Sequence, residues 1–235
     1  MDKVLSKNTS EVSSDPIYLV ATPTINSDHA DIQSYALDKV CAEDSDTVKA
    51  VALYYAVRDD IRYDPYSFDL DPASFAANLT LEAGVGWCVP KAILLAACCR
   101  ALGIPARLGF ADVKNHLSTE RLRETMKTDV FHWHGYTSIY LNGRWVKATP
   151  AFNVELCNKF GLKPLEFDGH EDSIYHEFDQ AGNRHMEYLL ERGEYADVPF
   201  EEMMGLFKEV YGGFFDEPDL QNHSFEDDVN REVSS

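Results

Sequence analysis

The most continuous run of apolar positions in the chain lies at residues 92–102. Every position there except Arg100 is apolar, a pattern typical of a helix that is buried on all sides. Pro90 suits the first turn of this helix, where its missing N–H is not needed, and Gly103 ends it with a left-handed residue. The pattern therefore predicts a central buried helix over about residues 90–102.

Shorter segments with helical spacing come before this helix. Their apolar residues recur every three or four positions, and polar capping residues stand at their starts. We expect helices over about 26–41 and 46–61, a short helix over 74–84, and a short strand at 17–20. Residues 1–16 are polar and mixed in charge, so we expect them to be disordered.

The pattern changes to strands after the central helix. Alternating and β-branched residues predict strands at 106–113, 131–141 and 144–150, and Asn142-Gly143 is a strong signal for a hairpin turn between the last two. A helix followed by an antiparallel meander indicates an α+β fold, with the central helix packed on the sheet.

The last third of the chain predicts a C-terminal hairpin plus a helix. The hairpin would join residues 174–178 to 185–190, and the helix would begin at Pro199 and end at Gly212-Gly213. Residues 216–235 are strongly acidic and predict a mobile tail. Because no linker interrupts the rest, we predict a single domain over residues 17–215.

Composition narrows the classes of function. The net charge is −19, from 21 basic and 40 acidic residues, and this balance argues against binding nucleic acid. No apolar run is long enough to span a membrane, and the polar N-terminus is unlike a signal peptide. Five cysteines, an odd number, fit reduced thiols. We therefore expect a cytoplasmic protein; the sequence carries no signal for an oligomeric state.

Cys88 stands out among the cysteines because it lies at the start of the central helix. The glycine-rich turn Gly84-Val85-Gly86-Trp87 leads into it. Open N–H groups and the positive end of the helix dipole stabilise a thiolate, which predicts a pKa lowered from about 8.5 towards 3.5–7.5. Cys98 and Cys99, deeper in the helix, are interpreted as core residues. Cys88 is the candidate nucleophile.

A cysteine nucleophile needs a base, and histidine performs that task near neutral pH. His134 is our candidate because it lies near the start of the second strand, and His132, two residues earlier on the same predicted face, is its nearest rival. A His-x-His pair also occurs in zinc sites, with His116 or Asp112 as a further ligand. A third ligand is not evident, so we expect no metal and no cofactor.

These residues resemble a known family. The resemblance lies in Gly86-Trp87-Cys88, in the helix end at residues 100–106, in His134-Gly135-Tyr136 and in residues 143–146. They are similar to the transglutaminase-like superfamily, whose members share a papain-like core in which the nucleophile heads a helix and a histidine and an aspartate follow on successive strands. The resemblance covers about residues 48–155. It implies Cys88 as the nucleophile and His134 as its base.

The third catalytic position departs from the family pattern. Thr149 stands where the family usually has its aspartate, and a threonine supplies no full negative charge. Asp112 ends the first strand, and an antiparallel neighbour would place it near His134. We rank Asp112 first as the group that orients the histidine, then Thr149, then Asn153. Trp87 is expected either to help form the acyl site or to cover the start of the helix.

The resemblance implies acyl transfer through a thioester on Cys88. The carbonyl attacked would be that of an amide or a thioester, followed by hydrolysis or transfer to an amine. Relatives also include biosynthetic acyltransferases, so a carrier-bound thioester with Dieckmann-type cyclisation is an alternative. The expected partner is a small-molecule, peptide or thioester-bound acyl substrate. A catalytically silent binding domain is the competing hypothesis from another class.

Overall fold

A computed structural model describes residues 15–115, 118–174, 181–182, 186–215 and 223–233. Its helices are α1 (Ala30–Asp38), α2 (Asp46–Asp60), α3 (Ala77–Ala83), α4 (Cys88–Ala101), α5 (Glu120–Met126), α6 (Val154–Phe160), α7 (Phe200–Phe215) and α8 (Phe225–Val233). Its strands are β1 (Arg62–Tyr63), β2 (Val85–Gly86), β3 (Ala106–Asn115), β4 (Val130–Leu141), β5 (Arg144–Ala148) and β6 (Met186–Tyr195). Short 3₁₀ turns lie at Pro16–Tyr18 and Pro72–Phe75.

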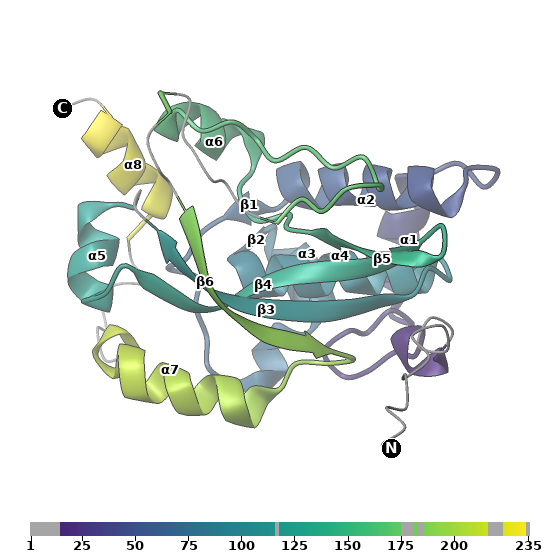
Figure 1. Ribbon diagram of the computed structural model, residues 1–235, viewed down its shortest axis with the longest axis horizontal. Helices are drawn as coiled ribbons and strands as arrows, with labels where there is room; N and C mark the ends of the chain where they lie inside the picture. Colours follow the sequence, from purple (N-terminus) through teal and green to yellow (C-terminus); the bar gives the residue numbers. More distant parts are fainter. Residues whose placement is uncertain (1–14, 116–117, 175–180, 183–185, 216–222, 234–235) are drawn as a thin grey trace, which may run out of the picture.

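The main sheet has four strands in the order β5-β4-β3-β6, and each neighbouring pair is antiparallel. Helix α4 packs on β4 and β3, and helices α1, α2 and α3 pack against α4 (Figure 1). The helix therefore lies between a sheet and other helices, which is why its sequence is apolar on every side. The predicted α+β fold, with a central helix on an antiparallel sheet, is confirmed.

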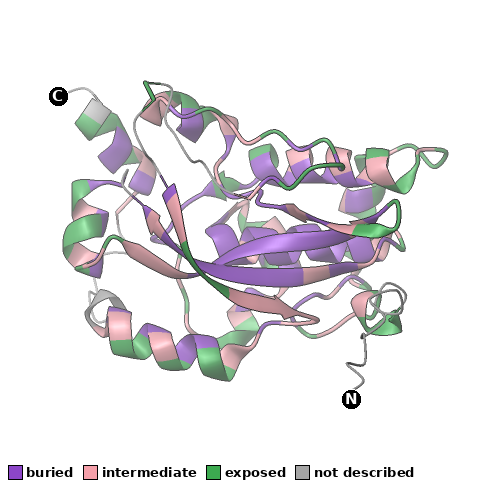
Figure 2. Ribbon diagram, viewed as in Figure 1, coloured by how far each residue is buried: buried purple, intermediate pink, exposed green. Residues whose placement is uncertain are grey.

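Burial follows the same arrangement. Helix α4 and the centre of the sheet are buried, whereas the outward faces of α7 and α8 are exposed (Figure 2). The one ammonium inside α4, that of Lys91, donates to the carbonyls of Arg58 (2.9 Å) and Ile61 (2.5 Å) at the end of α2. Burial lowers the pKa of Lys91 to about 7. These bonds fix α2 to α4 close to the candidate nucleophile.

Several element boundaries differ from the sequence predictions. Helix α1 is capped by the His29 side chain and starts four residues later than expected, at Ala30, and a 3₁₀ turn replaces the strand predicted at 17–20. Helix α7 continues through Gly212-Gly213 to Phe215. In contrast, Ser45 caps α2 as predicted.

The predicted C-terminal hairpin is only partly visible. Strand β6 forms where its second strand was expected, but it pairs with β3 and becomes an edge of the main sheet. Most of the other predicted strand, residues 175–178, lies outside the described residues. The tertiary pairing decided the outcome, because a strand next to β3 buries more surface than an isolated hairpin does.

The acidic C-terminus is not wholly mobile, contrary to our prediction. Helix α8 has Phe225 and Val229 buried, and its Asp228 accepts hydrogen bonds from the Tyr66 hydroxyl (2.9 Å) and Arg121 Nε (2.8 Å). An apolar stripe at four-residue spacing outweighed the acidic composition here. Disorder was predicted for residues 1–16; residues 1–14 lie outside the described residues, and Asp15 caps the 3₁₀ turn that begins at Pro16. No described helix has the length and apolar character needed to cross a membrane.

Candidate active site

Cys88 is the first residue of α4, and the start of this helix carries no side-chain cap. Strand β4 passes very close to it: a Cβ atom on Gly135 would lie 3.0 Å from the Val89 Cα atom. Backbone hydrogen bonds from Gly135, Val89 and Cys88 itself act to lower the pKa of the thiol. The glycine thus lets a strand supply a backbone donor to the sulfur at the helix start.

Burial nevertheless controls the ionisation of this thiol. Cys88 is only 6% exposed, and burial raises the pKa of its thiol to about 12 despite the three backbone donors. Our expectation of a lowered pKa is therefore wrong: desolvation of the thiolate outweighs the helix N-terminus. A thiolate here needs a proton acceptor close to the sulfur.

Replacing Gly135 with alanine is expected to destabilise the fold by about 1–3 kcal/mol, because the added methyl group meets the Val89 backbone and α4 must move away from β4. The same movement takes the Gly135 N–H from the sulfur, so turnover should also fall. Urea unfolding and initial rates measure the two effects. Gly205→Ala is the control, since nothing lies within 4 Å of a Cβ there; an equal loss in both variants would contradict the close-approach argument.

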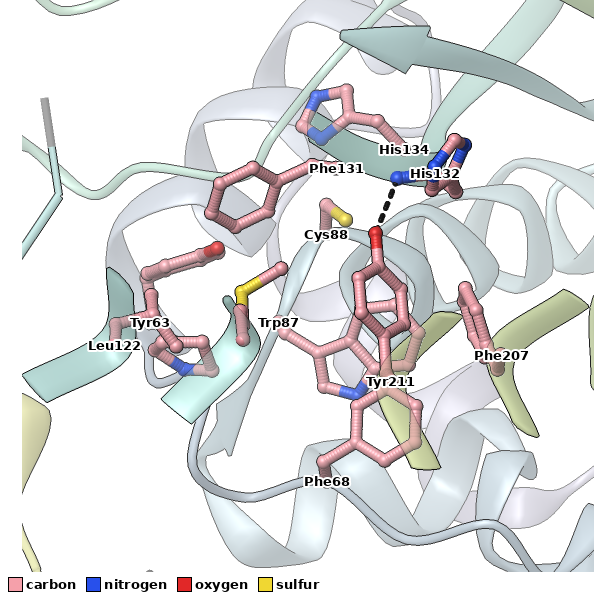
Figure 3. Close-up of a pocket in the computed structure, with 12 residues that line it drawn as sticks. Tyr63, Phe68, Trp87, Cys88, Leu122, Phe131, His132, His134, Phe207 and Tyr211 are labelled. Atoms are coloured by element: carbon pink, nitrogen blue, oxygen red, sulfur yellow. Dashed lines mark hydrogen bonds between the residues drawn. The ribbon is translucent and has the colours of Figure 1, made fainter. Parts of the chain in front are cut away.

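The thiol opens into a pocket with about 490 Å³ of empty space, part of it open to solvent. Both candidate histidines, His132 and His134, line this pocket together with Cys88 (Figure 3). The other lining residues come from the 63–68 segment, α5, β4, α7 and the residue before Cys88; they are Tyr63, Pro65, Phe68, Trp87, Leu122, Met126, Phe131, Phe207 and Tyr211. The sequence analysis brought Cys88 and the histidines together but did not identify α5 and α7 as walls.

A bulge in β4 separates the surroundings of the two histidines. Asp112 on β3 stands opposite both His132 and Trp133, and Trp133 has a left-handed φ of 58°. A bulge places an extra residue on one strand and breaks the alternation of its side chains. The ring of His132 consequently meets Asp112, with Nδ1 2.8 Å from Oδ2, whereas His134 pairs in register with Ala111.

The partners of Asp112 differ from those we predicted. Its carboxylate forms a hydrogen bond with Nδ1 of His132 (2.8 Å) and accepts one from the Trp133 N–H (3.1 Å). Two nitrogens of Arg192 also donate to it, at 2.5 and 2.6 Å. The prediction that Asp112 orients His134 is wrong in its partner, because the bulge turns His132 towards β3. Arg192, on β6, was not identified from the sequence.

Asp112→Asn is expected to lower stability by about 1.5–3 kcal/mol at pH 7, the value of hydrogen bonds to a charged group. Burial acts to raise the pKa of Asp112, but the bonds from Arg192 and His132 outweigh it and hold the pKa below its usual range. Because the pKa of Asp112 is lower in the folded than in the unfolded protein, its charge stabilises the fold. This stabilisation is complete above the unfolded-state pKa of about 3.9 and is lost as the pH falls through the folded-state pKa.

The wild type and Asp112→Asn should therefore differ in free energy of unfolding at pH 7, and this difference should shrink as the pH falls from about 4 through the lowered folded-state pKa. Chemical unfolding at a series of pH values measures this difference. Asp129→Asn serves as a control, since Asp129 binds Lys114 at the surface. A difference that persists unchanged at acidic pH would show that the Asp112 charge is not what stabilises the fold.

Thr149 and Asn153, the remaining candidates for orienting His134, lie in different places. Thr149 and His134 line one small cavity that has no room for a water molecule, and the Thr149 hydroxyl donates to the Ile174 carbonyl at 2.9 Å. Asn153 instead precedes α6 and accepts the Tyr63 N–H with its Oδ1 atom, at 3.2 Å. The structure thus brings Thr149, and not Asn153, to the cavity beside His134.

Comparison with known proteins identifies the family to which this chain belongs. The model of the transglutaminase-like superfamily matches residues 33–150, half of the chain. The chain belongs to the transglutaminase-like superfamily. The α+β, papain-like core expected from the resemblance is thereby confirmed, with the nucleophile helix followed by the antiparallel sheet.

Two solved structures are similar to this superfamily member. A candidate cysteine protease from Cytophaga hutchinsonii has 19% identity and a TM-score of 0.46 over 79% of this chain and 55% of its own. A candidate protease from Parabacteroides distasonis has 13% identity and a TM-score of 0.36 over 50% of this chain and 22% of its own. This chain therefore spans about half of the first protein and about a fifth of the second. No curated protein matches it.

Other residues of this transglutaminase-like chain complete the picture of the pocket. Trp87 lies at its wall, where its ring stacks on Phe68 with centroids 4.6 Å apart. The Tyr211 hydroxyl accepts the His132 backbone N–H (2.7 Å) and donates to the Val130 carbonyl (2.8 Å). Helix α7 is thereby tied to the strand that carries both histidines.

The zinc alternative lacks support within the described residues. They contain no group of three or more histidine, cysteine or acidic residues arranged to hold a metal ion. His116, proposed as a further ligand, lies outside them. Asp112 is close to His132, but Arg192 also binds its carboxylate, and a guanidinium at that position opposes binding of a cation.

Proposed function

We propose that the protein is a cysteine-dependent acyl-transfer enzyme in which Cys88 is the nucleophile and His134 its base. The observation that carries this proposal is the position of Cys88, which heads an uncapped helix and opens into a pocket that His134 also lines. Burial raises the pKa of the Cys88 thiol to about 12, so removal of its proton by a neighbouring imidazole is the step that activates it.

We choose His134 over His132 as the base because the carboxylate beside His132 already has a positively charged partner. A base in this mechanism must carry a positive charge for part of the cycle, and the guanidinium of Arg192 is bound to the same carboxylate as His132. That guanidinium already balances the Asp112 charge, so little of it is left to stabilise an imidazolium on His132. The sequence resemblance to the family also favours His134 as the base. We assign His132 a positioning role between Asp112 and Tyr211.

The reaction has two halves. His134 takes the Cys88 proton, the sulfur attacks the carbonyl carbon, and the tetrahedral intermediate expels the leaving group, which receives the proton from His134. Water then attacks the resulting thioester, gives a proton to His134, and releases the carboxylic acid as the Cys88 thiol is restored. The backbone N–H groups at the start of α4 are suited to stabilise the oxyanion, because no side chain caps them.

Water and an amine are both chemically competent acceptors. A thioester is a more reactive substrate than an amide, since a thiol is a better leaving group than an amine. A carrier-bound thioester that undergoes Dieckmann-type cyclisation is an alternative substrate. The net charge of −19 disfavours an acidic carrier protein unless a local basic surface receives it.

Acylation of Cys88 by a simple thioester tests the proposal. The protein would be incubated with hexanoyl-N-acetylcysteamine at pH 8, quenched in acid and analysed by intact mass and peptide mapping. We expect a hexanoyl adduct on Cys88, release of hexanoic acid over many turnovers, and neither in Cys88→Ser. If the thioester decays no faster than in buffer and Cys88 remains unmodified, the reading as a catalytically silent binding domain replaces this one.

A further inference from the structure

Resting on the function proposed above, we infer that the acyl group transferred by Cys88 is apolar and uncharged, such as a medium-length alkanoyl or arylalkanoyl group. The lining of the pocket carries this inference. Among the described residues that line it, none bears a carboxylate, an ammonium or a guanidinium. Apart from Cys88 and the two histidines, every one of these residues is aliphatic, aromatic, proline or methionine.

The walls are closely packed as well as apolar. Trp87 stacks on Phe68, and Phe207 of α7 lies against both rings, with centroids 6.2 Å from Trp87 and 5.6 Å from Phe68. Helix α5 contributes Leu122 and Met126 to the same pocket, and they are 2% and 8% exposed. The pocket is therefore built from packed core side chains, and Figure 3 shows them surrounding the thiol.

A charged acyl group would find no partner in such a pocket. Asp112 and Arg192, which lie behind the lining residue His132, already bind each other at 2.5 and 2.6 Å. A carboxylate or an ammonium would lose its hydration against apolar walls without a compensating ion pair, which is strongly unfavourable. Each methylene of an alkanoyl group, in contrast, is stabilised by leaving water.

The acyl part, and not the leaving group, is the natural occupant. The acyl group stays attached to Cys88 through both halves of the reaction, whereas the leaving group must depart after the first. An apolar enclosure beside the sulfur holds the group that stays. A departing thiol or amine is better served by the side that opens to solvent.

A series of N-acetylcysteamine thioesters tests the inference on the intact protein. We expect kcat/KM to rise about threefold to fourfold per methylene from butanoyl to octanoyl. Phenylacetyl should be accepted, and the anionic succinyl and cationic β-alanyl thioesters should react at least about 100-fold more slowly than hexanoyl. A second series keeps the hexanoyl group and lengthens the thiol instead; here we expect little change.

Two variants at one wall position sharpen the test. Met126→Lys should weaken the preference for hexanoyl over succinyl by tenfold or more, because it offers the succinyl carboxylate a cation, whereas Met126→Leu keeps the apolar wall and should preserve the preference. Circular dichroism and thermal unfolding check that both variants fold, and the wild-type series decides the question if Met126→Lys does not.

The failures of the two proposals can be told apart. If no thioester in either series acylates Cys88, the proposed function fails. If succinyl and hexanoyl react equally fast and Cys88→Ser abolishes both reactions, acyl transfer stands and the apolar preference is overturned. A chain-length effect found only in the leaving thiol would also overturn it.

Discussion

Cys88→Ser is expected to lower thioester turnover by more than about 10⁴-fold, on the scale observed when other hydrolases lose their nucleophile. The alcohol is far less acidic than the thiol and is a weaker nucleophile, so His134 cannot activate it to the same extent. The fold should remain intact, because the hydroxyl is slightly smaller than the thiol and still finds the backbone donors at the helix start. Steady-state rates and thermal unfolding measure the two properties.

Cys41→Ser is the matched control for this experiment. Cys41 is exposed, whereas Cys88, Cys98, Cys99 and Cys157 are buried. It should keep full turnover and stability. A Cys88→Ser variant that retains more than about a tenth of wild-type activity would remove Cys88 from the role of nucleophile, whatever its stability.

His134→Gln is expected to reduce turnover by about 10²–10⁴-fold, the usual contribution of a general base. It should also change the pH profile of kcat/KM, because the group that accepts the proton is removed. His132→Gln should lower turnover by only about tenfold. It removes a hydrogen bond to Asp112 that positions the strand, but it leaves the group that accepts the proton in place. Full pH profiles of kcat/KM for both variants distinguish a base from a positioning residue.

The reverse ranking would exchange the roles of the two histidines. If His132→Gln abolishes the pH dependence while His134→Gln leaves it unchanged, then His132 is the base and Asp112 orients it. His29→Gln is a suitable control, because His29 caps α1, pairs with Asp31 and does not line the pocket, and its replacement should leave the profile unaltered.

The nucleophile helix could be predicted because local signals agree there. The apolar run, the proline near its start and Gly103 after its end all indicate one helix, and Cys88 lies at its first position. The hairpin of β4 and β5 was equally clear, from its alternation and from Asn142-Gly143. Where local preference and tertiary packing agree, a pattern in the sequence predicts the structure.

The partner of Asp112 could not be predicted, because the argument assumed strict alternation along β4. The bulge at His132 and Trp133 adds one residue, so the side chains shift in face at the very residues in question. A bulge of this kind depends on a left-handed φ at Trp133 that tertiary contacts maintain. The ionisation of Cys88 was missed for a related reason: burial is a property of the packed molecule.

Helix α7 lies outside residues 33–150, the stretch that matches the family, yet its Phe207 and Tyr211 line the pocket beside Cys88. Under the proposed function, the thiol that reacts and part of the surface that faces the acyl group come from separate stretches of the chain. Mutations in α7 can change which acyl group is accepted while the nucleophile helix keeps its sequence. Divergence of substrate preference within such a lineage would then be recorded partly downstream of the shared core, in residues that a comparison of cores never aligns.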